Sequence, residues 1–251
     1  MRWDPDQYHR YGDERARPFH DLLGRIGAPA PRRVVDLGCG PGTTTALLAQ
    51  RWPGATVEGI DSSPEMISQA RAVPGISVTL GDVADWDSGG SVDVVVSNAT
   101  LQWVPEHEKL LARWATSVPD GGWLAFQVPG NFDAPAHTVL RSLAARWGVE
   151  HVLRHHDAVG SPASYATLLL DAGLQVDAWE TTYMHVLPGQ DPVLEWLRGT
   201  GLRPVLSVLS DSDAAQFCAE LADALRASYP PGAHGTLFAF RRIFAVGHKS
   251  R

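Results

Sequence analysis

A glycine-rich segment near the start of the chain constrains the fold more than any other feature. Residues 34–42 read VVDLGCGPG, so a short apolar run stops at three glycines that stand two positions apart. A buried strand that ends in glycines and leads into a helix brings the backbone close to a ligand at the carboxyl edge of a parallel sheet. The dinucleotide fingerprint G-x-G-x-x-G would need a glycine at position 43, where this chain has Thr43. The segment therefore predicts a ligand-binding α/β fold and disfavours a nicotinamide dehydrogenase.

Apolar runs of strand length alternate with helix-length segments in the first half of the chain. We expect strands at residues 33–38, 55–61, 76–80, 92–97 and 122–128. Helices are expected at 43–51, after Ser63 and at 107–117. Ser63 is suited to cap the second of these, with Pro64 at its first helical position. This alternation predicts a parallel sheet with helices on both faces and right-handed crossovers.

The pattern changes after residue 130. Segments 131–172 and 191–228 have helical composition, whereas 174–186 and 237–246 are typical of strands. We therefore expect one α/β domain with a helical cap inserted after the fifth strand. The predicted parts are an N-terminal arm and helix (1–31), the α/β core (32–130), the cap (131–172 and 187–232) and the C-terminal strands that complete the sheet (173–186 and 233–251).

Composition excludes several classes of protein. The chain has 28 acidic and 21 basic residues, a formal net charge of −7, which disfavours nucleic acid as a partner. Its apolar runs are far shorter than the roughly 18 residues of a membrane span, and the first residues lack the apolar core of a signal peptide. Two cysteines without a C-x-x-C pair indicate neither a disulfide framework nor a zinc site. We expect a cytoplasmic protein without a metal, and the oligomeric state stays open, a monomer being compatible with the sequence.

Polar residues follow four of the expected strands. Asp36 stands two residues before the first glycine, Asp61 ends the second strand, and Asp82 and Asn98 follow the third and fourth. A carboxylate at the position of Asp61 is suited to accept hydrogen bonds from both hydroxyls of a ribose. Each residue also has a simpler interpretation, because aspartate and asparagine at strand ends often cap turns, and Met66 in a first helical turn is often core. The four strand ends in this order favour a shared cofactor site.

The glycine segment and these strand ends resemble those of class I S-adenosylmethionine-dependent methyltransferases. The resemblance implies a Rossmann-like three-layer sandwich, with a mostly parallel seven-stranded sheet whose last strand is antiparallel. It also implies that Asp82 and the neighbouring backbone recognise adenine. The residues expected to bind S-adenosylmethionine are Asp36, Gly38, Gly40, Gly42, Asp61, Ser62, Met66, Asp82, Val83 and Asn98, together with Tyr8 and Tyr11 of the arm.

Nearly the whole chain is similar to the trans-aconitate methyltransferase family. The motifs that carry this similarity are Trp3-Asp-Pro-x-x-Tyr8, Arg17-Pro18, Asp61-Ser-Ser-Pro-x-Met66, Asn98-Ala-x-Leu-Gln-Trp103, Thr181-Thr-Tyr183, Gly199-Thr-Gly-Leu-Arg-Pro204 and Phe240-Arg-Arg. The resemblance implies methyl transfer to one carboxylate of trans-aconitate, which gives a monomethyl ester. A carboxylate with a pKa of about 4 is ionised at pH 7 and needs neither a general base nor a metal. In agreement, no histidine follows the glycine segment or the fourth strand, and His107 is expected on a solvated helix face.

All but two of the basic residues are arginine, which suits the recognition of carboxylates. We expect Arg203 and one of Arg241 and Arg242 to hold the carboxylates that are not methylated. Neighbouring residues on a strand face opposite sides, so only one of that pair should reach the substrate. The substrate-binding and positioning residues are expected to be Arg203, Arg241, Arg242, Gln102, Trp103, Asn131 and Tyr183.

Some alternatives stay open at this point. The same fold and cofactor would serve a different small-molecule acceptor, such as a secondary-metabolite carbon, nitrogen or hydroxyl group. A cofactor-binding module without catalysis is a further alternative, disfavoured by the set of Asp36, Asp61 and Asp82. The N-terminal aromatic residues either close over the cofactor or fasten a helix to the domain. The histidines at 151, 155 and 156 are expected to be solvated or capping rather than metal ligands.

Overall fold

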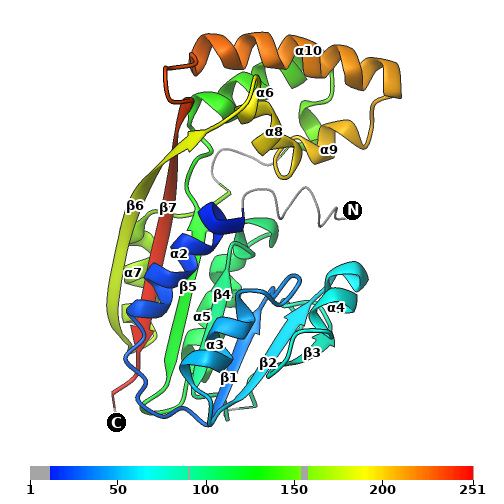
Figure 1. Cartoon of the computed structure of the whole chain (residues 1–251). Helices are drawn as coiled ribbons and strands as arrows, with labels where there is room; N and C mark the ends of the chain where they lie inside the picture. Colours follow the sequence, from blue (N-terminus) through cyan, green and yellow to red (C-terminus); the bar gives the residue numbers. More distant parts are fainter. Residues whose placement is uncertain (1–11, 90, 154–157, 251) are drawn as a thin grey trace.

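The computed structural model describes residues 12–89, 91–153 and 158–250, and its strands form one seven-stranded sheet in the order β3-β2-β1-β4-β5-β7-β6 (Figure 1). The first five strands are parallel to one another, and β7 is antiparallel to both β5 and β6. The predicted fold class, with its antiparallel last strand, is confirmed. The strands are β1 (Arg33–Leu37), β2 (Thr56–Asp61), β3 (Ser77–Leu80), β4 (Val94–Asn98), β5 (Trp123–Pro129), β6 (Gln175–Leu187) and β7 (Thr236–His248).

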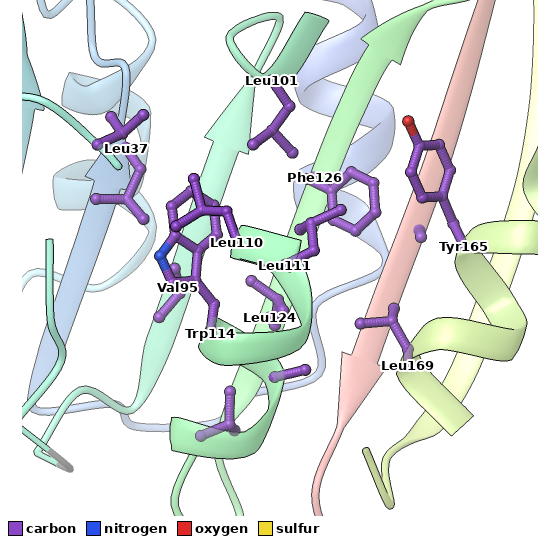
Figure 2. Close-up of a cluster of buried hydrophobic side chains, with 14 of the residues drawn as sticks. Leu37, Val95, Leu101, Leu110, Leu111, Trp114, Leu124, Phe126, Tyr165 and Leu169 are labelled. Atoms are coloured by element: carbon purple, nitrogen blue, oxygen red, sulfur yellow. The ribbon is translucent and has the colours of Figure 1, made fainter. Parts of the chain in front are cut away.

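Helices cover both faces of this sheet. On one face, α2 (Gly12–Gly24) and α3 (Thr45–Arg51) contribute to a core with β1, β4 and β5. On the other face lie α5 (His107–Ser117) and α7 (Pro162–Asp171), and Figure 2 shows side chains of both helices directed toward the strands. The helix α4 (Pro64–Ala70) packs against β2 and β3, and begins with the predicted Ser63 cap and Pro64.

Continuous apolar runs form the central strands because helices bury both of their faces. Val34 and Val35 of β1 are each fully buried, yet they belong to different cores. Side chains alternate along a strand, so Val34 contributes to the α2–α3 layer and Val35 to the α5–α7 layer. This placement produces the three-layer sandwich.

The cap is a separate layer beyond the carboxyl ends of the parallel strands (Figure 1). Its helices are α6 (Pro135–Arg146), α8 (Pro192–Arg198), α9 (Arg203–Leu206) and α10 (Asp211–Ser228). They enclose their own apolar core, to which Phe238 and Phe240 of β7 contribute. The expected cap boundary was wrong for one helix, because α7 packs against β6, β7 and α5. The apolar face of α7 is buried on the sheet, as the close packing of Tyr165 and Leu169 shows (Figure 2).

Two long strands connect sheet and cap. The last residue of β5, Pro129, pairs with Arg242 of β7, and beyond that point β7 pairs only with β6 as far as Leu187 and Thr236. The extension of these strands carries them up to the cap helices (Figure 1). In the part of the chain that the structure describes, no helix combines the length and the apolar character needed to cross a membrane.

Candidate active site

A cavity of about 430 Å³ lies between the carboxyl ends of the parallel strands and the cap. Its volume is within the range of small-molecule sites, and its position is the usual ligand position of an open α/β sheet. Sheet and cap both contribute side chains to it. Residues that follow β1 to β4 include Gly38, Gly40, Asp61, Ser62, Met66, Asp82, Val83 and Asn98. Residues beyond β5 include Asn131, Phe132, His137, Trp196, Thr200, Phe240 and Arg242.

The three glycines of the opening segment have different roles. Gly38, with φ of 84°, packs so closely on Thr100 that a Cβ would lie 2.0 Å from its Oγ1. Gly40, with φ of 56°, lines the cavity, and apart from Gly40 and its two chain neighbours no described residue has an atom within 4 Å of the position of a Cβ there. Gly42 does not line the cavity but packs against Ala70 and Ile76. Gly40 therefore leaves space for a ligand, whereas Gly42 serves the packing of α3 and α4, which corrects its expected direct contact.

Asp61 has a fixed orientation at the cavity. Its Oδ2 accepts a hydrogen bond from the backbone N–H of Gly40 at 2.9 Å, and its Oδ1 accepts one from that of Ser63 at 2.9 Å. The side chain lines the cavity at the end of β2. Because each carboxylate oxygen can accept more than one hydrogen bond, Asp61 retains acceptor capacity for a pair of hydroxyls.

Asp36 lies beneath the cavity instead of lining it, which corrects its expected position. The residue is 1% exposed, and its Oδ2 accepts a hydrogen bond from Thr45 Oγ1 at 2.6 Å. Among the described residues Oδ1 has no hydrogen-bond partner. Burial, with a smaller contribution from the charge of Asp61, raises the pKa of Asp36 to about 7. Asp36 therefore links β1 to α3 behind the glycine segment.

Three further residues form the side of the cavity near β2 and β3. Met66 and Val83 are nearly buried and line it with apolar surface. Asp82 is exposed at the cavity, and its Oδ1 also accepts a hydrogen bond from the backbone N–H of Ala84 at 2.9 Å. Asp82 therefore caps a turn, and that turn also lines the cavity.

The adjacent arginines of β7 face opposite sides, as the alternation predicts. Arg242 is 6% exposed, lines the cavity and stacks on Phe240 with 4.5 Å between its Cζ and the ring centroid. Arg241 faces away and forms an ion pair with Glu180, with 2.8 Å between Nη2 and Oε2. The cavity therefore contains a buried cation next to an aromatic surface, at the end farthest from β3 in the sheet order.

The other predicted acceptor-side residues divide into two groups. Gln102, Trp103 and Asn131 line the cavity, although both polar atoms of the Asn131 side chain bond to the backbone of Arg241. Tyr183 does not line it: the ring lies beside Arg17, and the hydroxyl donates to Asp21 of α2. Arg203 begins α9 and is not among the lining residues. Neither Tyr183 nor Arg203 therefore lines the cavity, contrary to expectation, and Tyr8 and Tyr11 lie outside the described residues.

Two histidines differ from expectation. His107 is 3% exposed rather than solvated, with 2.7 Å between its Nε2 and the hydroxyl oxygen of Tyr165, and burial lowers its pKa. His137 of α6 lines the cavity, and nothing in its local sequence indicates this position. Gln127, also in the cavity, stands near the end of β5, where the rule that located Asn98 would have found it.

Metal binding is not indicated in the described part of the chain. No group of three or more histidine, cysteine, aspartate or glutamate side chains there could hold an ion. The polar groups that line the cavity include amides, the Arg242 guanidinium, the carboxylates of Asp61 and Asp82, and the imidazole of His137.

Comparison with known proteins identifies the family. A methyltransferase-domain model matches residues 8–178. A trans-aconitate 2-methyltransferase from Mycolicibacterium gilvum is 56% identical over 97% of this chain and 98% of its own length. One from Streptomyces avermitilis is 51% identical over 98% of this chain and 97% of its own. The chain belongs to the trans-aconitate 2-methyltransferase family.

Solved structures agree at the level of the fold. The YcgJ protein from Bacillus subtilis has a TM-score of 0.59 at 16% identity, covering 94% of this chain and 99% of that protein. A phosphoethanolamine N-methyltransferase from Haemonchus contortus, solved with S-adenosyl-L-methionine, has a TM-score of 0.56 at 16% identity and covers 94% of this chain and 53% of that one. These trans-aconitate 2-methyltransferase relatives and the methyltransferase-domain model thus show that the chain is a methyltransferase, and the solved structures show that it shares their fold.

Proposed function

We propose that this protein transfers a methyl group from S-adenosylmethionine to one carboxylate of trans-aconitate, producing a monomethyl ester and S-adenosylhomocysteine. The observation that carries the proposal is a single cavity with Asp61 at one end and the buried Arg242 at the other. The names of the relatives, at 51–56% identity over nearly the full length, supply the acceptor. We also propose a cytoplasmic location, which suits an enzyme whose acceptor is a soluble tricarboxylate.

The residues of the cavity fit the cofactor. Asp61 offers fixed carboxylate oxygens to ribose hydroxyls, Gly40 leaves open space at the backbone, and Met66 and Val83 provide an apolar surface for a flat base. When bound there, S-adenosylmethionine would supply an electrophilic methyl carbon, and a carboxylate oxygen that attacked this carbon would displace the sulfur, which leaves as the thioether of S-adenosylhomocysteine. Asp82 and Asn98 border the same space.

The side chains of the protein position the reactants and do not transfer a proton. A carboxylate acceptor is ionised at neutral pH, so the new C–O bond forms without removal of a proton. Arg242, buried beside Phe240, is suited to hold a second carboxylate of the acceptor through charge-assisted hydrogen bonds. Trp103, Phe132 and Trp196 line the cavity with aromatic surface, which helps to exclude water from the reacting atoms. Such positioning lowers the entropic cost of bringing two reactants together.

One experiment tests the proposal directly. The protein is incubated with methyl-labelled S-adenosylmethionine and a panel of di- and tricarboxylates, and base-labile methyl esters are measured. We expect trans-aconitate to give the highest kcat/KM of the panel. Tight binding of S-adenosylhomocysteine without ester formation from any acid would contradict the proposed acceptor.

A second candidate function follows from His137. This side chain lines the cavity from α6, so it is placed where a general base for a hydroxyl acceptor would be needed. The variant His137→Gln distinguishes the two candidates. If the acceptor is a carboxylate, the kcat of His137→Gln should lie within a few-fold of that of the unmodified protein. The pH dependence of kcat should have the same shape in both proteins. A loss on the order of 100-fold, typical for removal of a general base, would favour the hydroxyl acceptor.

A further inference from the structure

Three polar side chains of the cavity form a chain across neighbouring strands. Gln127 Nε2 donates to Asn98 Oδ1 at 2.7 Å, and Arg242 Nη1 lies 3.5 Å from Gln127 Oε1. Asn98 and Gln127 are paired residues of β4 and β5. Gln127 is 1% exposed, so solvent does not replace these partners. This hydrogen-bond network therefore connects the guanidinium on β7 to Asn98 at the end of β4.

The direction of every hydrogen bond in this chain follows from the arginine. A guanidinium only donates, so the oxygen of Gln127 must face Arg242. The nitrogen of Gln127 then faces Asn98, whose oxygen accepts. The Asn98 amide keeps its Nδ2 as a donor, and Asn98 lines the cavity, so we take this donor to serve a bound ligand. Rotation of either amide would place two donors or two acceptors against each other inside a buried network, at a high cost in free energy.

The position of Asn98 gives this donor a use. Asn98 lies between the Gly38–Asp61 part of the cavity and the part lined by Gln102 and Arg242. A hydrogen-bond donor at that boundary can bind the carboxylate of the substrate at the point where this carboxylate must approach the methyl group. A neutral amide orients such a carboxylate without the strong charge neutralisation that a second arginine would cause.

We propose that Gln127 is a positioning residue for methyl transfer. It transmits the fixed polarity of Arg242 to Asn98, so that the Asn98 amide donates to the carboxylate that is methylated while Arg242 binds a different carboxylate of the same molecule. This proposal rests on the proposed function. Each residue then has its own role. Arg242 binds the substrate, Asn98 orients the carboxylate that is methylated, and Gln127 couples these two residues.

The variant Gln127→Glu tests the coupling. Glutamate accepts from Arg242 but has no N–H for Asn98, so the Asn98 amide is free to present its oxygen to the cavity. We expect kcat with trans-aconitate to fall on the order of 10- to 100-fold, as when a reacting group is misplaced. The affinity for S-adenosylhomocysteine and the thermal midpoint serve as controls for folding. Gln127→Met, similar in size and uncharged, is the second variant. It should also lower kcat, whereas Arg242 stays charged and the KM for trans-aconitate should change less than kcat does.

A double-mutant comparison separates positioning from a structural role. Asn98→Ala removes the donor, so adding Gln127→Glu to it should lower kcat by no more than about two-fold further. Independent, multiplicative losses in the double variant would overturn the proposal, as would a kcat of Gln127→Glu equal to that of the unmodified protein. If the unmodified protein forms no ester from any acid, the proposed function fails instead. If trans-aconitate is methylated but kcat is unchanged by substitution of Gln127, only the positioning role is rejected.

Discussion

Arg241 and Arg242 show how much one residue position decides. The two side chains are chemically identical neighbours, yet one pairs with Glu180 outside the cavity and the other lies buried within it. We predict that Arg242→Ala raises the KM for trans-aconitate on the order of 10- to 100-fold, since hydrogen bonds to charged groups contribute roughly 1.5–3 kcal/mol. Arg241→Ala, the matched control, should leave it nearly unchanged. Steady-state kinetics with saturating cofactor provide the measurement, and equal effects of the two variants would refute the assignment.

The buried Asp36 carries a prediction about stability and pH. Its folded-state pKa of about 7 is far above the value of about 4 in an unfolded chain, so the folded protein binds the extra proton. The free energy of unfolding therefore loses a contribution as pH rises from about 4 through 7. Asp36→Asn keeps an acceptor for Thr45 and removes the charge. We expect it to be more stable than the unmodified protein at pH 8, on the order of 1–3 kcal/mol, and by less at pH 5. Urea unfolding at both pH values measures this difference.

The opposite dependence is expected for His107. Burial lowers its pKa, so the folded protein keeps this imidazole neutral where the unfolded chain would protonate it. Its contribution to stability is present above the unfolded pKa of about 6.5 and is lost as pH falls below that value. His107→Gln should show a smaller decrease in unfolding free energy between pH 7.5 and 5.5. The exposed His151, changed to glutamine, is the control, and identical pH slopes for His107→Gln and the unmodified protein would contradict this view.

At the scale of elements, the β6–β7 extension links the two cores of the sheet to the core of the cap. Sheet and cap have separate buried clusters, and Phe217 of α10 is fully buried in the cap cluster. The inner side chains of the extension, such as Phe238 and Phe240, belong to the cap core, whereas Met184 and Leu237 are exposed on it. Cap stability is therefore set largely by contacts that the sheet does not share.

This division predicts a local effect of a cap mutation. Phe217→Ala removes a buried ring and should destabilise the cap by about 3–5 kcal/mol. Amide hydrogen exchange should quicken in α8 and α10 while α5 keeps its protection. Because the cofactor residues lie on the sheet, S-adenosylhomocysteine should still bind, and the acceptor KM should rise. Phe126→Ala in the sheet core is the comparison, which should reduce protection throughout the molecule.

At the scale of the whole molecule, net charge gives a misleading indication of the partner. The chain carries a formal charge of −7, yet the proposed acceptor is an anion. Arg242 resolves this, because a buried guanidinium in a cavity with aromatic and amide surroundings acts locally, while the remaining charges are screened by water and salt. Sheet and cap together form the cavity, so binding depends on their relative position.

The sequence by itself determined the fold class and which strand ends border the cavity. Strand ends are marked locally: Asp61, Asp82 and Asn98 each follow an apolar run, and the parallel topology brings those ends to one edge. The opposite facing of Arg241 and Arg242 followed from alternation alone. These features need only the periodicity of the chain.

Only the tertiary structure decided which residues line the part of the cavity under the cap. Alternation predicts that one of two arginines faces the cavity but not which, because the phase depends on how β7 packs against β5. Tyr183 lies under α2 and α7 lies on the sheet, since helical composition does not tell which surface a helix covers. His137 reaches the cavity only because the cap folds over the strand ends. Contacts between segments far apart in the sequence leave no local pattern, and those contacts form the side of the cavity where we propose that the acceptor binds.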